Sequence, residues 1–268
     1  MIEKTEAIAV RMEAFSETSR IVTWTTPSHG RITTIIKGSQ RPKSAFLGQY
    51  DLFYTCELLY YVRDRSGLRI ARECAPITMR NRLRTDWKAC AIASYASDLT
   101  QRVMHEDSPQ EEVYTHLADT LDFLQANGSK NGLLPWFEIQ LLTLLGLAPR
   151  LKTCLGCGKD LLPATGRARF SLSRGGTLCS ACAGNSTVDS ISIAPDVLAI
   201  LAGWQRSKTA RAAATTVVTP RQADEMNEIL GAFLVYHLDM VLPGRSACLD
   251  ILRRASAGKS LESPQRGS

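Results

Sequence analysis

Four cysteines of the chain stand in two Cys-x-x-Cys pairs, Cys154 with Cys157 and Cys179 with Cys182. Each pair can form a tight turn that presents two sulfur atoms to one metal ion. Two such turns supply four thiolates, the set that suits tetrahedral Zn²⁺ at about 2.3 Å per Zn–S bond. Gly156 relieves the crowded backbone of the first pair. We therefore predict that Cys154, Cys157, Cys179 and Cys182 bind one structural zinc ion.

Two other uses of these thiols compete with zinc. An iron–sulfur cluster also takes four thiolates, whereas a redox dithiol needs one Cys-x-x-Cys pair and leaves the second unexplained. A catalytic zinc ion normally keeps one position open for water, and four cysteines close the shell, so a structural role is favoured. The other cysteines stand singly in apolar patterns typical of small buried residues: Cys56, Cys74, Cys90 and Cys248.

Length and composition describe an ordinary globular chain. Its 268 residues allow one large domain or two to three small ones, and it is 44% hydrophobic and 22% charged. No apolar run approaches the ~20 residues that span a bilayer, and the N-terminus does not resemble a signal peptide. We therefore expect a cytoplasmic protein with no membrane contact. Reduced thiols in that compartment favour metal binding over disulfides. The small, polar residues 256–268 are predicted to be a mobile tail.

Charge is unevenly distributed along the chain. The net charge of +6 divides into +4 for residues 1–80, −2 for 81–153, +3 for 154–186 and +1 for 187–268. The positive excess thus lies in the N-terminal segment and around the paired cysteines. It favours a polyanionic partner, although solubility alone explains a mild excess equally well.

The first eighty residues show the alternation and β-branched content of strands. Turn signals at 27–30 and 64–67 separate runs that we predict as strands over 7–12, 20–26, 31–36, 52–62 and 68–72. Five short strands in ~75 residues predict a small barrel. An OB-like barrel fits the count, and an SH3-like barrel fits nearly as well.

The sequence becomes helical after Pro76. Helices are predicted over 86–104, 107–127, 133–145, 194–204 and 219–242; Asp107 or Ser108 is expected to cap the second, and Pro243-Gly244 to end the last. Residues 169–178 are expected to form a hairpin that delivers the second cysteine pair. The predicted fold is therefore α+β and multidomain: an N-terminal five-stranded OB-like barrel (1–80), then a helical domain (81–153 and 187–255) into which a four-cysteine zinc module (154–186) is inserted.

A basic loop follows the third predicted strand. Residues 37–44 combine Lys37, Arg41 and Lys43 with a glycine and two hydroxyl groups, which can offer charge and backbone N–H groups to phosphates. The alternative is a solvated loop without a partner. Aromatic residues nearby are available to stack on bases, although core packing is their commoner fate: Trp24, Phe46, Tyr50, Phe53 and Tyr54.

Motifs of catalysis are missing from the sequence. It contains no Gly-x-Gly-x-x-Gly, no complete phosphate-binding Gly-x-x-x-x-Gly-Lys-Ser/Thr motif and no His-Glu-x-x-His. Acidic pairs such as Glu111-Glu112 stand at helix starts, where the helix dipole accounts for them. We predict that the protein is not an enzyme.

Three stretches resemble the N-terminal barrel of the RecO family of bacterial recombination mediators: residues 16–23 (SETSRIVT), 29–32 (HGRI) and 37–44 (KGSQRPKS). Residues 131–147 resemble the helix of that family that leads into its zinc module. The order of barrel, helices, four-cysteine module and helices is also similar, so that the resemblance covers roughly residues 5–255.

The resemblance implies a nucleoid-associated protein that binds single- and double-stranded DNA, anneals complementary strands and helps to load RecA. Its implied partners are RecR and the acidic C-terminal tail of single-strand-binding protein. By the same resemblance, the matching basic positions of the barrel are candidate DNA contacts: Arg20, Arg31, Lys37, Arg41 and Lys43.

A second hypothesis comes from a different class of function. A zinc-ribbon protein whose barrel binds RNA or protein, in translation or transcription, has the same elements in the same order. A metal-dependent nuclease is disfavoured because no cluster of carboxylates appears in the sequence.

Overall fold

Five N-terminal strands close into a barrel in the computed structural model, which describes residues 1–62, 69–162, 166–184 and 189–256. They are β1 (Ile2–Ala14), β2 (Arg20–Thr26), β3 (Gly30–Ile36), β4 (Thr55–Tyr61) and β5 (Arg69–Thr78). Their order is β1-β2-β3-β5-β4, and the antiparallel pairing of β1 with β4 completes the circle. Neighbouring strands are antiparallel except β3 and β5, which run parallel.

The five predicted strands are all present, with different bounds. β1 is longer than predicted: Ile2 to Ile8 pair with β4, and Ile8 to Ala14 pair with β2, with an irregularity between Ala9 and Arg11 in the second pairing. β5 continues past Pro76, which lies at another irregularity in the ladder. The predicted turn at 64–67 lies outside the described residues. The barrel has a core of its own, made by side chains that alternate inward along the strands, including Trp24, Ile32, Ile36, Leu58 and Tyr60.

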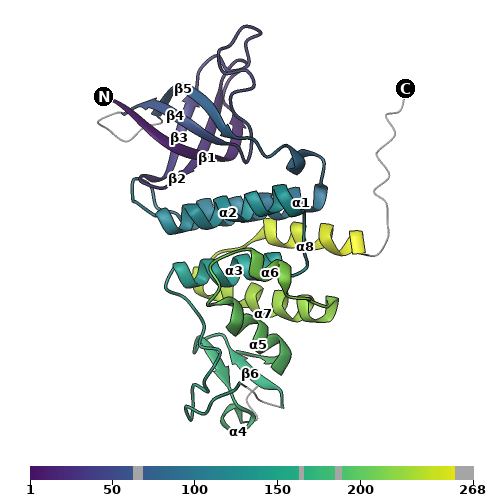
Figure 1. Cartoon of the computed structure of the whole chain (residues 1–268). Coiled ribbons are helices and arrows are strands. Elements are labelled where there is room, and N and C mark those ends of the chain that lie inside the picture. The colour runs from purple at the N-terminus through teal and green to yellow at the C-terminus, as the bar shows by residue number, and fades with distance from the viewer. Residues whose placement is uncertain (63–68, 163–165, 185–188, 257–268) are drawn as a thin grey trace.

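Helices form the middle of the molecule (Figure 1). They are η1 (Asn81–Arg84), α1 (Trp87–Val103), α2 (Glu111–Asn127), α3 (Leu133–Leu144), α5 (Pro195–Trp204), α6 (Arg211–Thr215), α7 (Pro220–Leu238) and α8 (Pro243–Ser256). Two starts were predictable from capping chemistry. Asp86 accepts a hydrogen bond from Ala89 N at the start of α1, and Thr219 forms a capping box with Gln222 at the start of α7.

Two predicted helix ends are wrong. α2 begins at Glu111 after Gln110, and neither Asp107 nor Ser108 caps it. Asp107 instead adopts a left-handed conformation and pairs with Arg69 of the barrel. α7 ends at Leu238, because Asp239 is left-handed, and Pro243 begins a further helix, α8, which the sequence did not predict. α8 reaches Ser256, so the predicted tail lies almost wholly outside the described residues.

The cysteine segment contributes two strands to a three-stranded sheet at the far end of the molecule. Its order is β7 (Gly176–Leu178), β6 (Ala168–Ser171), β8 (Ser190–Ile193), and the one-turn helix α4 (Ser180–Ala183) follows β7. The predicted hairpin is β6–β7, and β8 was not predicted. Phe170 of β6 is fully buried and its ring packs edge-on against that of Phe233 on α7, 5.4 Å between centroids. The sheet therefore shares one core with the helices.

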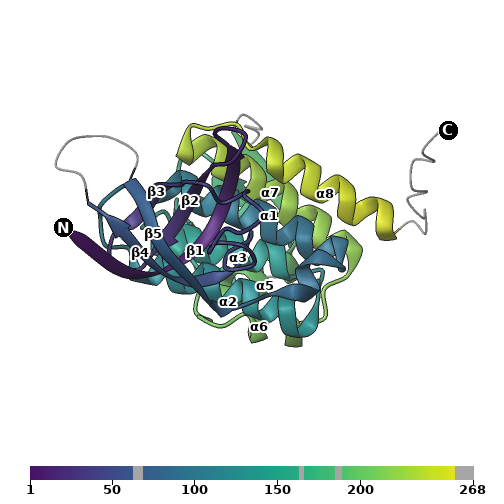
Figure 2. The same ribbon diagram turned by 90° about the horizontal axis from the view of Figure 1, so that it is seen from above.

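The barrel lies against α1 and α2 (Figures 1 and 2), and polar contacts join it to them. Arg80 is 2% exposed and donates to Asp122 Oδ1 (2.7 Å), to Phe53 O (2.5 Å) and to Thr55 Oγ1 (2.9 Å). Gly30 lies so close to residues 105–108 that an added Cβ would be 2.3 Å from His105 O. Among the described helices, none is long and apolar enough to cross a membrane.

Candidate metal centre and nucleic-acid interface

The four paired cysteines converge on one point at the far end of the small sheet. All four Sγ atoms lie within 4.8 Å of one another, and the Sγ atoms of Cys157 and Cys179 are 3.9 Å apart. A tetrahedron with ~2.3 Å Zn–S bonds has S–S edges of about 3.8 Å. The two pairs thus come together at a separation that a four-thiolate metal ion requires.

The backbone shapes this cluster. Gly156 N and Cys179 N each donate a hydrogen bond of 3.3 Å to Cys154 Sγ. An added Cβ on Gly156 would lie 2.9 Å from both Cβ and Sγ of Cys182, so this position has no room for a side chain. Gly158 has a φ of +72° and closes the first turn by donating to Cys154 O at 2.9 Å.

The thiols respond differently to their surroundings. Burial opposes ionisation of Cys154, but the backbone N–H donors around its sulfur outweigh burial and lower its pKa to about 6. Hydrogen bonding with the thiols of Cys179, Cys157 and Cys154 raises the pKa of Cys182 to about 12. Four thiolates at these separations repel one another unless a cation lies between them. A metal ion would supply that charge and, with four sulfur ligands, would leave no position for a reacting water.

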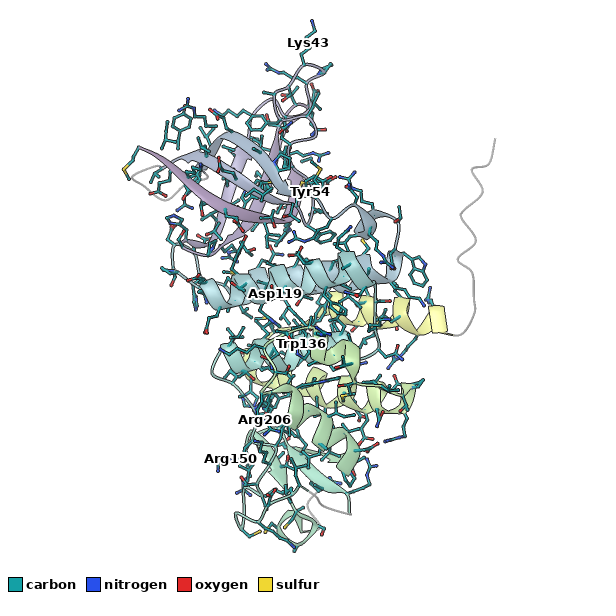
Figure 3. All side chains as sticks on the ribbon, viewed as in Figure 1. Lys43, Tyr54, Asp119, Trp136, Arg150 and Arg206 are labelled. Atoms are coloured by element: carbon teal, nitrogen blue, oxygen red, sulfur yellow. The ribbon has the colours of Figure 1, made fainter. Side chains whose placement is uncertain are left out.

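The loop of residues 37–54, between β3 and β4, carries the predicted DNA-binding cations. Its first part is held against the β1–β2 turn: Gly38 N donates to Ser19 Oγ (3.1 Å) and Gln40 N to Thr18 O (3.0 Å). Lys37, Arg41 and Lys43 are exposed, and none forms an ion pair with a carboxylate of the described residues. Lys43 projects from the end of the molecule opposite the cysteines (Figure 3). We call Lys37, Arg41 and Lys43 the barrel-loop cations.

The other two predicted contacts differ from each other. Arg20 is partly exposed beside this loop, where its Nη2 donates to Gln40 Oε1 at 3.4 Å. Arg31 lies at the junction with the helices, where Nη1 donates to Gln101 O and Nη2 to Glu106 Oε1, each at 3.1 Å. The structure therefore groups Arg20 with the barrel-loop cations and places Arg31 apart from them.

The aromatic residues of the barrel are mostly core residues. Trp24 is fully buried and donates to Thr34 Oγ1 (2.9 Å), Phe53 and Tyr54 are each 6% exposed, and Phe46 and Tyr50 pack on the barrel core. Phe15 is 55% exposed and lies in the β1–β2 turn, whose Thr18 and Ser19 contact the basic loop. Sequence reasoning missed Phe15; an aromatic residue in a polar turn is the signal that marks it.

Comparisons with known proteins agree over nearly the whole chain. Residues 1–80 match the family model "Recombination protein O N terminal", and residues 84–246 match "Recombination protein O C terminal". The chain belongs to the RecO family. It is 32% identical to the DNA repair protein RecO of Roseiflexus sp. (strain RS-1), over 94% of this chain and 87% of the relative. It is 31% identical to that of Anaeromyxobacter sp. (strain K), over 90% of this chain and 94% of the relative.

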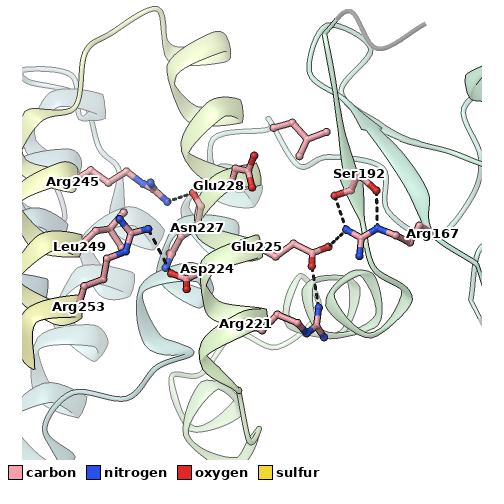
Figure 4. A pocket seen from close by; sticks show the side chains of 11 residues that line it. Arg167, Ser192, Arg221, Asp224, Glu225, Asn227, Glu228, Arg245, Leu249 and Arg253 are labelled. Atoms are coloured by element: carbon pink, nitrogen blue, oxygen red, sulfur yellow. Dashed lines mark hydrogen bonds and ion pairs between the residues drawn. The ribbon is translucent and has the colours of Figure 1, made fainter. Parts of the chain in front are cut away.

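This RecO-family chain uses many of its arginines internally. In the pocket between α7, α8 and β8, Glu225 accepts hydrogen bonds from Arg167 and Arg221, each at 3.0 Å (Figure 4). At its floor, Arg245 is 8% exposed and binds the fully buried Glu138 through Nε (2.6 Å) and Nη2 (3.0 Å). Arg245 is held by a buried carboxylate, and at Arg167 and Arg221 a phosphate would have to compete with Glu225.

Proposed function

We propose that this protein is a non-enzymatic recombination mediator that binds single- and double-stranded DNA and anneals complementary strands. Membership of the RecO family supports this proposal, and so do the relatives named as DNA repair proteins. In the same proposal, it helps to load RecA onto strands coated by single-strand-binding protein. Its partners are RecR and the C-terminal tail of that protein, with RecA acting indirectly.

The observation that carries the proposal is the exposed, unpaired state of the barrel-loop cations. A phosphate can bind Lys37, Arg41 and Lys43 without displacing a carboxylate of the described residues, whereas at Arg31 it would compete with Glu106. We therefore assign the principal contacts to these three residues and Arg20, and a lesser one to Arg31. Phe15 is the side chain that we propose to stack on a base, a contact worth about 1–3 kcal/mol.

We assign the barrel to the OB type. Its strand order β1-β2-β3-β5-β4, with β3 and β5 parallel, supports this assignment, and so does the basic loop at one end. We keep the predicted division of the chain, with a barrel over 1–80 and a zinc module over 154–186, as part of the proposal. We also propose that the metal is Zn²⁺ in a structural role, which the four-sulfur donor set supports.

Replacing all three barrel-loop cations tests the proposal. The K37A/R41A/K43A variant should bind single-stranded DNA at least tenfold more weakly at 100 mM salt, because each lost phosphate contact removes the release of a counterion. Its plot of log K against log[salt] should flatten by roughly 0.7 per contact, about 2 in all. Titrating a fluorescent oligonucleotide at several salt concentrations measures both quantities.

A matched control removes three exposed cations from the same barrel that do have carboxylate partners. Lys4 pairs with Glu57, Arg11 with Glu13 and Arg72 with Glu73, so that K4A/R11A/R72A changes the net charge equally. This control should retain most of the affinity. Equal losses in the two variants would show that net charge, not the loop, drives binding. Failure of the wild-type protein to accelerate annealing of oligonucleotides coated by single-strand-binding protein would count against the mediator function itself.

A further inference from the structure

A second group of exposed cations surrounds the cysteine end of the molecule. It consists of Arg150, Lys152, Arg174, Arg206 and Lys208, which we call the module surface. All five are exposed, and none forms an ion pair with a carboxylate of the described residues. They come from three separate stretches of sequence, so that no run of basic residues predicted them.

Backbone contacts bring the three stretches together. Arg150 N donates to Gly175 O and Thr177 N donates to Arg150 O, each at 2.9 Å, which seats Arg150 against the β6–β7 hairpin that carries Arg174. Arg174 Nη2 donates to Leu155 O (3.2 Å), on the turn of the first cysteine pair. Between Arg150 and Lys152, Leu151 is 1% exposed, so the inward side chain of this extended segment alternates with two outward cations.

The third stretch is the end of α5. Gln205 Nε2 donates to Pro149 O (2.7 Å), and Trp136 Nε1 donates to Ser207 O (3.2 Å). These bonds fix the turn that carries Arg206 and Lys208 beside the segment of Arg150. Figure 3 shows Arg206 and Arg150 on one flank of the molecule, at the end opposite Lys43.

The composition of this flank favours an extended polyanion over a peptide. In the described residues of 145–162, 166–184 and 203–215, the one carboxylate side chain is that of Asp160. The same ranges contain none of the exposed large hydrophobic side chains, which lie elsewhere in the described chain: Phe15, Leu47, Trp87 and Val217, for example. A peptide partner usually needs an apolar anchor, whereas a phosphate backbone needs only spaced cations.

We propose that the module surface is a second binding surface for a DNA backbone, so that one molecule holds two strands at opposite ends. This inference rests on the proposed function, because it assumes that the barrel-loop cations bind the first strand. It gives the cysteine centre a purpose: the metal would hold the β6–β7 hairpin, and with it Arg174, in place beside Arg150. Two strands held by one molecule are brought together without any chemical step.

The test combines variants of the two surfaces. R150A/K152A/R206A should retain at least a third of the affinity for a short oligonucleotide that fills only the barrel site. In the K37A/R41A/K43A background, the same changes should weaken the residual binding by a further tenfold or more. The slope of log K against log[salt] should also flatten by about 2. No further loss in that background would overturn the proposal, while the proposed function would still stand on the barrel-loop result.

Bridging provides a second readout. An immobilised oligonucleotide saturated with protein should capture a second, non-complementary fluorescent oligonucleotide, and R150A/K152A/R206A should reduce that capture at least fivefold. The matched control is R167A/R221A/R253A, whose cations pair with Glu225, Asp196 and Asp224; it should capture as the wild type does. Unchanged metal content and melting temperature show that the variants fold. Wild-type capture by R150A/K152A/R206A would overturn the proposal and leave the flank free for an acidic protein.

Discussion

The barrel loop and the module surface present the same kind of side chain on two different scaffolds. Lys37, Arg41 and Lys43 stand on a closed barrel that has its own hydrophobic core. Arg150 and Arg174 lie beside a small sheet that adjoins the four cysteines and whose core continues into the helices. If a metal ion binds the cysteines as proposed, unpaired cations are displayed by packing at one end and with the help of a metal at the other, and the two ends should fail under different conditions.

The helical middle shows a third use of the same residue types. Arg80 and Arg245 are almost completely buried, and their guanidinium groups are consumed by carboxylates and carbonyl oxygens. What distinguishes a cation available to a ligand is therefore its partners, not its position in the sequence. Changes that act on one region at a time test whether the two ends are held in place independently.

Metal loss should have the largest effect and should act on one end alone. C157S/C182S removes two of four ligands from a site of a kind worth about 10–16 kcal/mol in apparent binding free energy. We expect zinc content to fall from one equivalent to near zero, and protease cleavage to appear at residues 154–160 and 179–184. The barrel should stay intact. Cys90→Ser, a cysteine outside the cluster, is the control. A variant that kept one equivalent of zinc and resisted protease would refute the proposal that a metal ion bound by these cysteines holds this end of the molecule.

The second largest effect should come from breaking the buried ion pair between Arg245 and Glu138, which should destabilise the whole fold and not one end in particular. Arg245→Met leaves the fully buried carboxylate of Glu138 without its cation, which costs about 3–5 kcal/mol in unfolding free energy. Tyr95 OH also donates to Glu138 (2.7 Å). The double variant E138Q/R245M keeps an acceptor for Tyr95 without the charge, and should recover part of the loss. Urea unfolding measures both, and a single variant as stable as the double one would contradict this account.

The third effect depends on pH and comes from His116, a buried residue of α2 whose ring packs against Phe137 of α3. Burial lowers its pKa to about 4, against the opposing hydrogen bond with Phe137 O (3.0 Å). The unfolded chain binds this proton near pH 6.5, so the stability it contributes is complete above pH 6.5 and is lost as the pH falls toward 4.

We expect the wild type to lose about 2 kcal/mol through His116 between pH 7 and pH 5. His116→Gln does not titrate, so the difference in unfolding free energy between the two proteins should shrink by that amount over the same range. Taking this difference cancels the protons that the cysteine centre binds. A difference that stayed constant with pH would show that His116 has the same pKa in the folded and unfolded chains, so that burial does not lower it.

Local chemistry made part of this structure predictable. The spacing of the cysteines predicted that their four sulfur atoms would come together, and Asp86 and Thr219 marked helix starts because capping depends on neighbours within one turn. The five strands were predictable from alternation, though not their lengths, because where a strand ends depends on its pairing with neighbouring strands.

Contacts between distant segments could not be predicted. Asp107 precedes a helix and is of a residue type that caps helices, but its carboxylate forms an ion pair with Arg69 of the barrel. Pro243 was taken as a helix stop, yet it begins α8, which packs on α1. Likewise, Arg31 and Lys37 are cations at the two ends of one strand, β3. Only the fold shows that Arg31 forms an ion pair with Glu106. Availability of a charge is a property of tertiary structure.

The smallest predicted effect separates stability from DNA binding. Thr219→Ala removes the cap of α7, whose Phe233 packs on Phe170 of the small sheet, and should cost about 1 kcal/mol. Asp86→Ala removes the cap of α1, the helix on which the barrel rests, at a similar cost. Neither change removes an unpaired cation or a cysteine, so both variants should keep full metal content. Thr219→Ala should also keep wild-type DNA affinity, whereas Asp86→Ala releases Arg82 from its ion pair (3.7 Å) and is compared for stability alone. If Thr219→Ala weakened DNA binding as much as R150A/K152A/R206A does, losses at the module surface would reflect the stability of its scaffold. If it does not, those losses belong to the cations themselves.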